Sequence, residues 1–240
     1  MRLWEDHAIG FVRDCNWLQH YENVIDAYHL LILHAANSGD QFGSVVTTAG
    51  WPDLTFEETD LGVRYNMLRD LPNGNFLERH AEVVLPNIAL IPSIHEQGTE
   101  PKEEAHATEV NWAVPVDNEH LFGISIVAWP LDENGDPVEG WKPGIDTVAD
   151  IRPGNLRNRP YEEKQRYPDD MEAQESQRPI AIRGLENLGT SDRGIVLLRR
   201  ALKKAAEAVA AGKDPANIVR DETNNHAITT HAWNTVRIPD

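Results

Sequence analysis

Residues 14–36 read DCNWLQHYENVIDAYHLLILHAA, a stretch that contains neither glycine nor proline and mixes apolar with polar residues. Asp14 is a suitable N-cap, because its carboxylate can accept a hydrogen bond from the first turn of a helix. The triplet Asn37-Ser38-Gly39 has the residue types that commonly end a helix. The sequence therefore predicts one long, mostly buried helix over residues 14–36.

This predicted helix carries a carboxylate and two histidines, Asp26, His29 and His34. Asp26 and His29 share a face, but the five-residue spacing turns His34 about 140° away from His29 on an ideal helix. For both imidazoles to hold one metal ion, the helix has to widen or bend, and π-type bulges of that kind cluster at functional sites. The alternative is that each histidine is simply satisfied by one hydrogen bond. The apolar run LLIL between them weakens that alternative, because an uncompensated polar ring is costly in such surroundings.

Residues 44–130 consist of short β-rich runs separated by turns, a texture that indicates an antiparallel sheet. Pro72-Asn73-Gly74 predicts a hairpin turn, because asparagine and glycine tolerate positive φ, and residues 116–119 predict a second one. The predicted strands are SVVTTAG (44–50), LTFEET (54–59), LGVRYNML (61–68), FLERHAEVVL (76–85), TEVNWAVPV (108–116) and LFGISIVAW (121–129).

The C-terminal half adds two helices and two irregular stretches. Residues 169–177 predict a short helical turn, and Ser191–Ala211 predict a long amphipathic helix that ends at Gly212. A long excursion is expected at about 131–168, and a polar tail at about 213–240. Helix, sheet and long C-terminal helix favour an α+β architecture, with residues 1–240 forming a single domain.

Composition excludes several classes of partner. The formal net charge of -17 argues against nucleic acid and anionic membrane, both of which reward clustered lysine and arginine. Cys15 is the only cysteine, so the chain builds neither a disulfide framework nor a multi-cysteine metal site. The sequence shows no signal peptide and no apolar stretch long enough to span a bilayer. We therefore expect a cytoplasmic protein whose partner is a small molecule or another protein.

Two segments carry a resemblance to a known family. Residues 16–34, NWLQHYENVIDAYHLLILH, closely resemble the mononuclear iron motif of Rieske non-haem iron oxygenases, which ends in Asp-x-x-His-x-x-x-x-His. Residues 169–202 resemble the closing segment of the phthalate dioxygenase and vanillate O-demethylase-like branch of the α-subunit catalytic domain. Two matches in the family's own order argue against coincidence.

The resemblance implies that His29, His34 and Asp170 are the ligands of a mononuclear Fe(II). Two imidazoles and a carboxylate hold iron on one face and leave positions open for dioxygen. A shift of one residue in the match would make Asp169 the carboxylate ligand. The family more often has glutamine before the ligand, and it usually has glycine where this chain has Arg178.

Asp26 corresponds to the family's bridging aspartate, which connects the iron to the Rieske cluster of a neighbouring subunit. Its expected role is to accept a hydrogen bond from a ligand imidazole and to shorten the path of the electrons. Asn23 either lines the same pocket or makes an ordinary hydrogen bond between helices. Asp26 and Asn23 are thus the candidate catalytic residues outside the iron ligands.

The family's two-iron two-sulfur Rieske cluster is held by two cysteines and two histidines, and its Cys-x-His and Cys-x-x-His motifs are missing from this sequence. The resemblance therefore implies that electrons come from an external Rieske centre and an NAD(P)H-dependent reductase. It also implies a helix-grip (START-like) fold, with a curved antiparallel sheet around a pocket, and subunits that assemble as a homotrimer. The chain is then a truncated or split gene product, a separated catalytic domain, or a natural subunit that lacks the Rieske half.

The leading hypothesis is an oxygenase domain that activates dioxygen at Fe(II) to hydroxylate or O-demethylate an aromatic compound. A redox-inactive helix-grip protein that binds a small aromatic ligand is one alternative. A zinc-dependent hydrolase that uses the same three residues is another. Metal content distinguishes them, because they require iron, no metal and zinc respectively.

Overall fold

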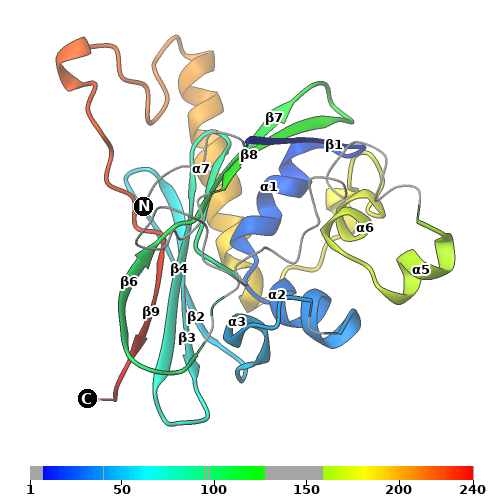
Figure 1. Ribbon diagram of the computed structural model, residues 1–240. Coiled ribbons are helices and arrows are strands. Elements are labelled where there is room, and N and C mark those ends of the chain that lie inside the picture. Colours follow the sequence, from blue (N-terminus) through cyan, green and yellow to red (C-terminus); the bar gives the residue numbers. More distant parts are fainter. Residues whose placement is uncertain (1–7, 40, 95, 97, 128–158, 240) are drawn as a thin grey trace.

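The computed structural model describes residues 8–39, 41–94, 96, 98–127 and 159–239. Figure 1 shows a bent antiparallel sheet with helices packed against it. Within the described residues the sheet has nine strands: β1 (Ala8–Arg13), β2 (Asp53–Glu58), β3 (Gly62–Asp70), β4 (Phe76–Val84), β5 (Ile88–Ile91), β6 (Lys102–His106), β7 (Glu109–Pro115), β8 (Leu121–Val127) and β9 (Trp233–Arg237).

The strand order is β1-β8-β7-β5-β4-β3-β2, and β9 pairs with both β4 and β6. Strand β4 pairs along its first half with β9 and along its second half with β5. The sheet therefore parts into two arms at β4, and Figure 1 shows them leading away in different directions. The predicted hairpins are both present, since β3 pairs with β4 and β7 with β8 in antiparallel register.

The helices are α1 (Trp17–Ile25), α2 (His29–Leu31), α3 (Val45–Thr48), α5 (Tyr161–Arg166), α6 (Asp170–Glu175) and α7 (Arg193–Ala210), and a π-helix, η1 (Ile32–Asn37), continues α2. Shorter 3-10 turns are η3 (Arg183–Leu185), η4 (Thr190–Asp192) and η5 (Glu222–Asn224). None of the helices in the described ranges is long and apolar enough to cross a membrane. The predicted α+β class, antiparallel sheet and long helix near the C-terminus are confirmed.

The prediction of one unbroken helix over residues 14–36 is wrong. Asn16, and not Asp14, caps α1, because its Oδ1 accepts a hydrogen bond from the backbone N–H of Leu18 at 3.1 Å. The helix stops at Asp26, whose carboxylate accepts from the N–H of Tyr28 at 3.0 Å. Such local side-chain bonds compete with the helical ladder. The chain then resumes as α2 and widens into η1, the π-type geometry that the histidine spacing requires.

The prediction of a strand over residues 44–50 is also wrong, because α3 forms there. Ser44 caps α3 by accepting from the N–H of Val46 at 3.1 Å. The hydroxyl groups of Thr47 and Thr48 donate to the carbonyl oxygen of Ser44 at 3.0 and 2.9 Å. These local bonds outweigh the β propensity of four β-branched residues in a row.

Much of the predicted excursion at 131–168 lies outside the described residues, and its last part forms α5. Most of the predicted polar tail at 213–240 is irregular, but its end forms β9, which inserts beside β4. The tail is therefore anchored to the sheet over Trp233–Arg237. Whether residues 1–240 form one domain stays a prediction.

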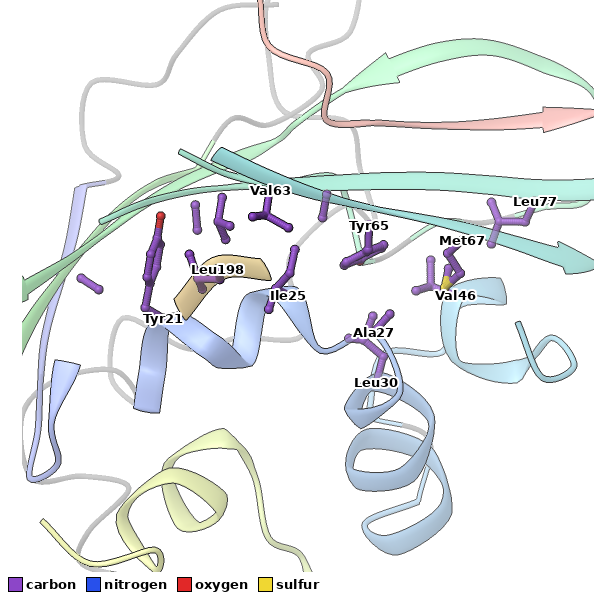
Figure 2. Close-up of a cluster of buried hydrophobic side chains, with 14 of the residues drawn as sticks. Tyr21, Ile25, Ala27, Leu30, Val46, Val63, Tyr65, Met67, Leu77 and Leu198 are labelled. Atoms are coloured by element: carbon purple, nitrogen blue, oxygen red, sulfur yellow. The ribbon is translucent and has the colours of Figure 1, made fainter. Parts of the chain in front are cut away.

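The core lies between the sheet and the helices. Figure 2 shows Val63 and Tyr65 of β3 on the side of the sheet that faces Ile25 of α1 and Leu198 of α7, with Met67 farther along the strand, beside α3. All five side chains are almost fully buried. Because the hydrophobic faces of two helices meet the same side of the sheet, α1 is held rigidly in front of it.

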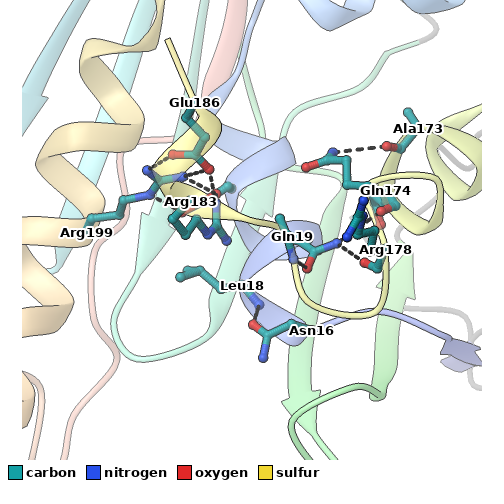
Figure 3. Close-up of polar contacts among 12 residues, drawn as sticks. Asn16, Leu18, Gln19, Ala173, Gln174, Arg178, Arg183, Glu186 and Arg199 are labelled. Atoms are coloured by element: carbon teal, nitrogen blue, oxygen red, sulfur yellow. Dashed lines mark hydrogen bonds and ion pairs between the residues drawn. The ribbon is translucent and has the colours of Figure 1, made fainter. Parts of the chain in front are cut away.

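Polar contacts fasten α1 to the segments that follow α5 (Figure 3). The Nε2 group of Gln19 donates to the carbonyl oxygens of Gln174 and Arg178 at 3.1 and 3.0 Å. In return, the Oε1 atom of Gln19 accepts from the N–H of Ala181 at 2.9 Å. One buried amide thus fixes the position of α6 relative to α1, two elements that are about 150 residues apart in the sequence.

Arg178 has a φ of 81°, in the left-handed region that favours glycine. This conformation gives a physical reason for the glycine that the family resemblance expects at this position. Replacing Arg178 by glycine is expected to stabilise the fold by up to about 1 kcal/mol, because relief of strain exceeds the added entropy of the unfolded chain. Chemical denaturation measures the change. Arg178→Ala is the matched control, since it removes the same exposed side chain and keeps the strain; an equal gain in both variants would contradict the explanation.

Candidate metal centre

Three side chains that are distant in sequence converge beside α1. His29, His34 and Asp170 each offer one ligand atom, and these atoms lie within 4.8 Å of one another. The Nε2 atom of His34 is 3.2 Å from Oδ1 of Asp170, and the Nε2 atom of His29 is 3.8 Å from the same oxygen. Among the residues that the structure describes, this is the group of histidine, cysteine and acidic side chains with a spacing suited to one metal ion.

The broken helix brings the two histidines together. His29 is the first residue of α2 and His34 lies in the π-helix η1. The wider turn of η1 offsets the angle that five residues would produce on an ideal helix. As a result, the centroids of the two imidazole rings are 5.4 Å apart. This geometry follows from the break at Asp26 and the widening after Leu31.

The capping of α6 decides which of two adjacent aspartates faces the histidines. Asp169 is the N-cap, and its Oδ1 accepts from the N–H of Met171 at 2.7 Å, while its own N–H donates to Glu172 at 3.0 Å. Burial and the neighbouring carboxylate of Glu172 raise the pKa of Asp169 to about 6. Asp170 is the first residue of the helix and points to the two imidazoles. The structure therefore brings Asp170, and not Asp169, into the group.

Hydrogen bonds at the far nitrogen of each ring set the orientation of both histidines. The Nδ1 atom of His29 makes a very short contact with the carbonyl oxygen of Asp26. The Nδ1 atom of His34 lies 2.6 Å from Oε1 of Gln41. An oxygen acceptor at Nδ1 fixes the proton there, so the lone pair of each Nε2 is directed into the group. Two such nitrogens and one carboxylate form the donor set that suits a divalent transition metal.

The charges in the group are strongly coupled. Burial alone would raise the pKa of Asp170, but the hydrogen bond from His34 and the charge of the nearby imidazoles hold this pKa well below its usual range. Burial opposes the charged form of His34, yet the hydrogen bond to Asp170 raises the pKa of its imidazole. The carboxylate thus stays ionised and stabilises positive charge beside it, whether a proton or a metal cation carries that charge.

Asn23 reaches the group from α1. Its Nδ2 donates to Oδ1 of Asp170 at 3.2 Å and lies 3.4 Å from Nε2 of His29. The amide of Asn23 therefore lies beside the group, and its bond to Asp170 is also a hydrogen bond between α1 and α6. A catalytic role of Asn23 stays a prediction. The hydrogen bond to Asp170 holds the carboxylate in place between the two histidines.

The expectation that the Asp26 carboxylate accepts a hydrogen bond from a ligand imidazole is wrong. The main-chain carbonyl of Asp26 contacts His29, whereas the carboxylate accepts from the N–H of Tyr28. The side chain therefore acts on His29 through the backbone, because it stabilises the turn that presents the carbonyl. A bridge from Asp26 to a neighbouring subunit remains a prediction.

Sequence patterns missed two features of this region. Gln41 follows the π-helix in a loop, and no motif marks it. His20, which has no motif context in the sequence, is buried between Gln174 of α6 and Asn111 of β7, at 3.0 and 3.3 Å. Burial lowers the pKa of His20 to about 4, so its ring is neutral at physiological pH. This buried polar chain joins α6 to the sheet behind the three candidate ligands.

Gln41→Leu is expected to weaken the binding of Fe(II) roughly 10- to 100-fold, because His34 loses the acceptor that fixes its tautomer and ring orientation. A titration against a competing chelator measures the affinity. Gln41→Glu keeps an oxygen acceptor and is expected to retain binding. Gln177→Leu, an exposed amide next to α6, is the matched control; an equal loss there would show that the effect is not specific to His34.

No protein-family model matches the chain. Similar proteins include a phenoxybenzoate dioxygenase subunit alpha from Ectopseudomonas oleovorans, 35% identical over 87% of this chain and 47% of that protein. A tert-butanol monooxygenase/tert-amyl alcohol desaturase oxygenase subunit from Aquincola tertiaricarbonis is 33% identical over 92% of this chain and 48% of its own length. A 5,5'-dehydrodivanillate O-demethylase oxygenase subunit from Sphingobium sp. is 30% identical, over 90% of this chain and 47% of that protein. The chain thus spans about half the length of these relatives.

Proposed function

Because the chain is a relative of the oxygenase subunits of Rieske-type enzymes, we propose that it is an oxygenase domain in which His29, His34 and Asp170 bind one Fe(II). The single observation that carries this proposal is the convergence of the three ligand atoms within 4.8 Å. The hydrogen bonds at both Nδ1 atoms support it, since they leave both Nε2 atoms ready to bind a cation.

We propose further that the reaction is hydroxylation or O-demethylation of an aromatic compound. Two of the relatives are named for aromatic compounds, phenoxybenzoate and dehydrodivanillate, whereas a third is named for small tertiary alcohols. An aromatic substrate is therefore the better supported class for this chain. Iron held by two histidines and one carboxylate would supply open positions for dioxygen.

The residues of the site divide the remaining tasks. His29 and His34 hold their rings in one tautomer, through Asp26 and Gln41 respectively. Asp170 supplies the negative charge that neutralises part of the charge of a divalent ion. Asn23 donates to that carboxylate and restricts its rotation. Together these contacts restrict the three donors, which lowers the ordering cost of binding a metal ion.

Electrons have to enter from outside these 240 residues, because their one cysteine cannot hold a two-iron two-sulfur cluster of the Rieske type. We propose that they come from a Rieske centre that is served by an NAD(P)H-dependent reductase. The turn at Asp26 is the proposed point of contact with that centre, within an assembly that we propose to be a homotrimer. In this scheme these 240 residues provide all three iron ligands, and another protein provides the electrons.

Metal analysis after anaerobic purification tests the proposal. About one iron per chain is expected, together with oxygen consumption that depends on a reduced Rieske-containing partner and an aromatic substrate. Stoichiometric zinc with activity that needs no oxygen would instead identify a hydrolase. If the chain takes up no metal, even when ferrous iron is supplied, the result would favour a redox-inactive protein that binds a small aromatic ligand.

A further inference from the structure

A buried arginine on the inner face of the sheet uses only one of its three guanidinium nitrogens in a hydrogen bond within the described residues. Arg69 lies near the end of β3, and its side chain is 1% exposed. Residues alternate between the faces of a strand, so Arg69 lies on the same face as Tyr65 and Met67, which Figure 2 shows directed toward the helices. Its Nη1 group donates to the carbonyl oxygen of Ala49 at 3.4 Å. Among the residues that the structure describes, its Nε and Nη2 groups have no hydrogen-bond partner.

A second buried arginine lies beside it. Arg79 of β4 is directly opposite Met67, so Arg69 and Arg79 are diagonal neighbours on one face. Arg79 is also 1% exposed, and it donates to neutral oxygens of Tyr65, Ser93 and Asn234, at 2.9, 2.9 and 3.0 Å. Within the described part of the chain, neither arginine is paired with a carboxylate. Two positive charges therefore share a dry region without a counter-charge, which is an unfavourable arrangement.

Burial lowers the pKa of Arg69 to about 10, and the charge of Arg79 acts in the same direction. The guanidinium group nevertheless remains charged at neutral pH. Loss of a proton therefore does not remove the desolvation cost of burying this positive charge. A bound anion would stabilise the charge more than a neutral partner would.

The other arginines of the chain show what the unpaired edge of Arg69 is suited to hold. Arg199 donates from Nε and Nη2 to the two oxygens of Glu22, at 2.5 and 2.9 Å. Arg220 uses the same two groups on the two oxygens of Asp214, at 3.0 and 2.7 Å. Nε–H and Nη2–H are parallel donors whose spacing matches a carboxylate. The unpartnered pair in Arg69 is this same edge.

We propose that the Nε and Nη2 groups of Arg69 bind the carboxylate of a small organic acid. Tyr65 and Arg79 form the neighbouring polar wall, and Arg79 adds a second positive charge that favours an anion. Two carbonyl oxygens of the loop over residues 49–52 accept hydrogen bonds near this edge: that of Ala49 from Arg69 at 3.4 Å, and that of Pro52 from Tyr28 at 3.3 Å. In this proposal the ligand enters at this loop, whose hydrogen bond to Arg69 is at the long end of the normal range.

A carboxylate of the chain itself is the competing source of the same chemistry. The two sources differ in one respect: an internal carboxylate excludes an added acid, whereas a ligand site binds it. The proposal also stands apart from the iron site, because none of its groups is a candidate metal ligand.

Isothermal titration calorimetry with sodium benzoate tests the proposal, and benzyl alcohol is the uncharged probe of similar shape. The wild-type protein is expected to bind benzoate and to discriminate against the alcohol. Arg69→Met and Arg69→Lys are expected to weaken benzoate binding roughly 10- to 100-fold, because both lose the paired donors and the lysine keeps the charge. Arg64→Met removes an arginine from the opposite face of β3 and is expected to leave binding unchanged.

His34→Ala separates this proposal from the proposed iron site, because benzoate binding is expected to persist in that variant even when iron is lost. Wild-type protein that binds no benzoate, combined with strong destabilisation by both Arg69 variants, would assign the edge to an internal carboxylate and overturn the proposal. Benzoate binding that is unaffected by Arg69→Lys would overturn it as well. Lysine retains the length and charge of the side chain, so this variant serves as the test even where the methionine variant does not fold.

Discussion

His34→Ala is expected to remove iron from the protein almost completely. The imidazole provides one of three ligand atoms, and its Nε2 lies 3.2 Å from Oδ1 of Asp170, the carboxylate that completes the group. The loss in affinity should exceed the roughly 10- to 100-fold that follows removal of a supporting residue such as Gln41. Metal analysis of protein purified without oxygen and reconstituted with ferrous iron measures the remaining content. His29→Ala is expected to have the same effect, since its Nε2 faces the same oxygen.

His120→Ala is the matched control for both variants. His120 is exposed in the turn between β7 and β8 and pairs with Asp117 through Nδ1 at 2.8 Å. Its removal is expected to leave the iron content unchanged. Circular dichroism shows whether each variant retains the fold, because an unfolded variant would lose iron for a trivial reason. Full iron content in both His29→Ala and His34→Ala would refute the ligand assignment.

The residues of the candidate site could be predicted from the sequence, whereas the contacts that orient them could not. The resemblance pointed to His29, His34 and Asp170, and it left Asp169 as an alternative. The choice between the two aspartates depends on a local competition, since Asp169 is bound by the first turn of α6. Gln41 carries no signal in the sequence, because its contact with His34 arises from the path of the loop after η1.

The fold likewise contains elements that local sequence patterns predict and elements that depend on contacts with distant residues. Strands with clear alternation, such as β3 and β4, were predicted within a few residues. Strands β1, β5, β6 and β9 are short or lie in polar sequence, and their pairing depends on partners elsewhere in the chain. The break between α1 and α2 escaped prediction, because one side-chain bond from Asp26 overrides a pattern that is otherwise helical.

A partly buried ion-pair network connects the helix that carries Asn23 to the C-terminal helix. Figure 3 shows Arg183, Glu186 and Arg199 gathered beside α1. Glu22, on α1, accepts from Arg183 at 2.7 Å and from Arg199 at 2.5 and 2.9 Å, and its side chain is only 8% exposed. Glu186 accepts from both arginines as well, so two carboxylates balance two guanidinium groups.

Glu22→Gln is expected to destabilise the fold by about 2–4 kcal/mol, because it removes the charge that two partly buried arginines share and keeps the shape of the side chain. Chemical denaturation measures the change, and a double-mutant cycle with Arg199→Gln separates the pair energy from other effects. Glu58→Gln is the control, since Glu58 pairs with Lys204 at 3.7 Å on the surface, where such a pair contributes little. Folded Glu22→Gln should still bind iron, because Glu22 contacts none of the candidate ligands in the structure. Equal losses of stability in the Glu22 and Glu58 variants would show that burial does not strengthen this network.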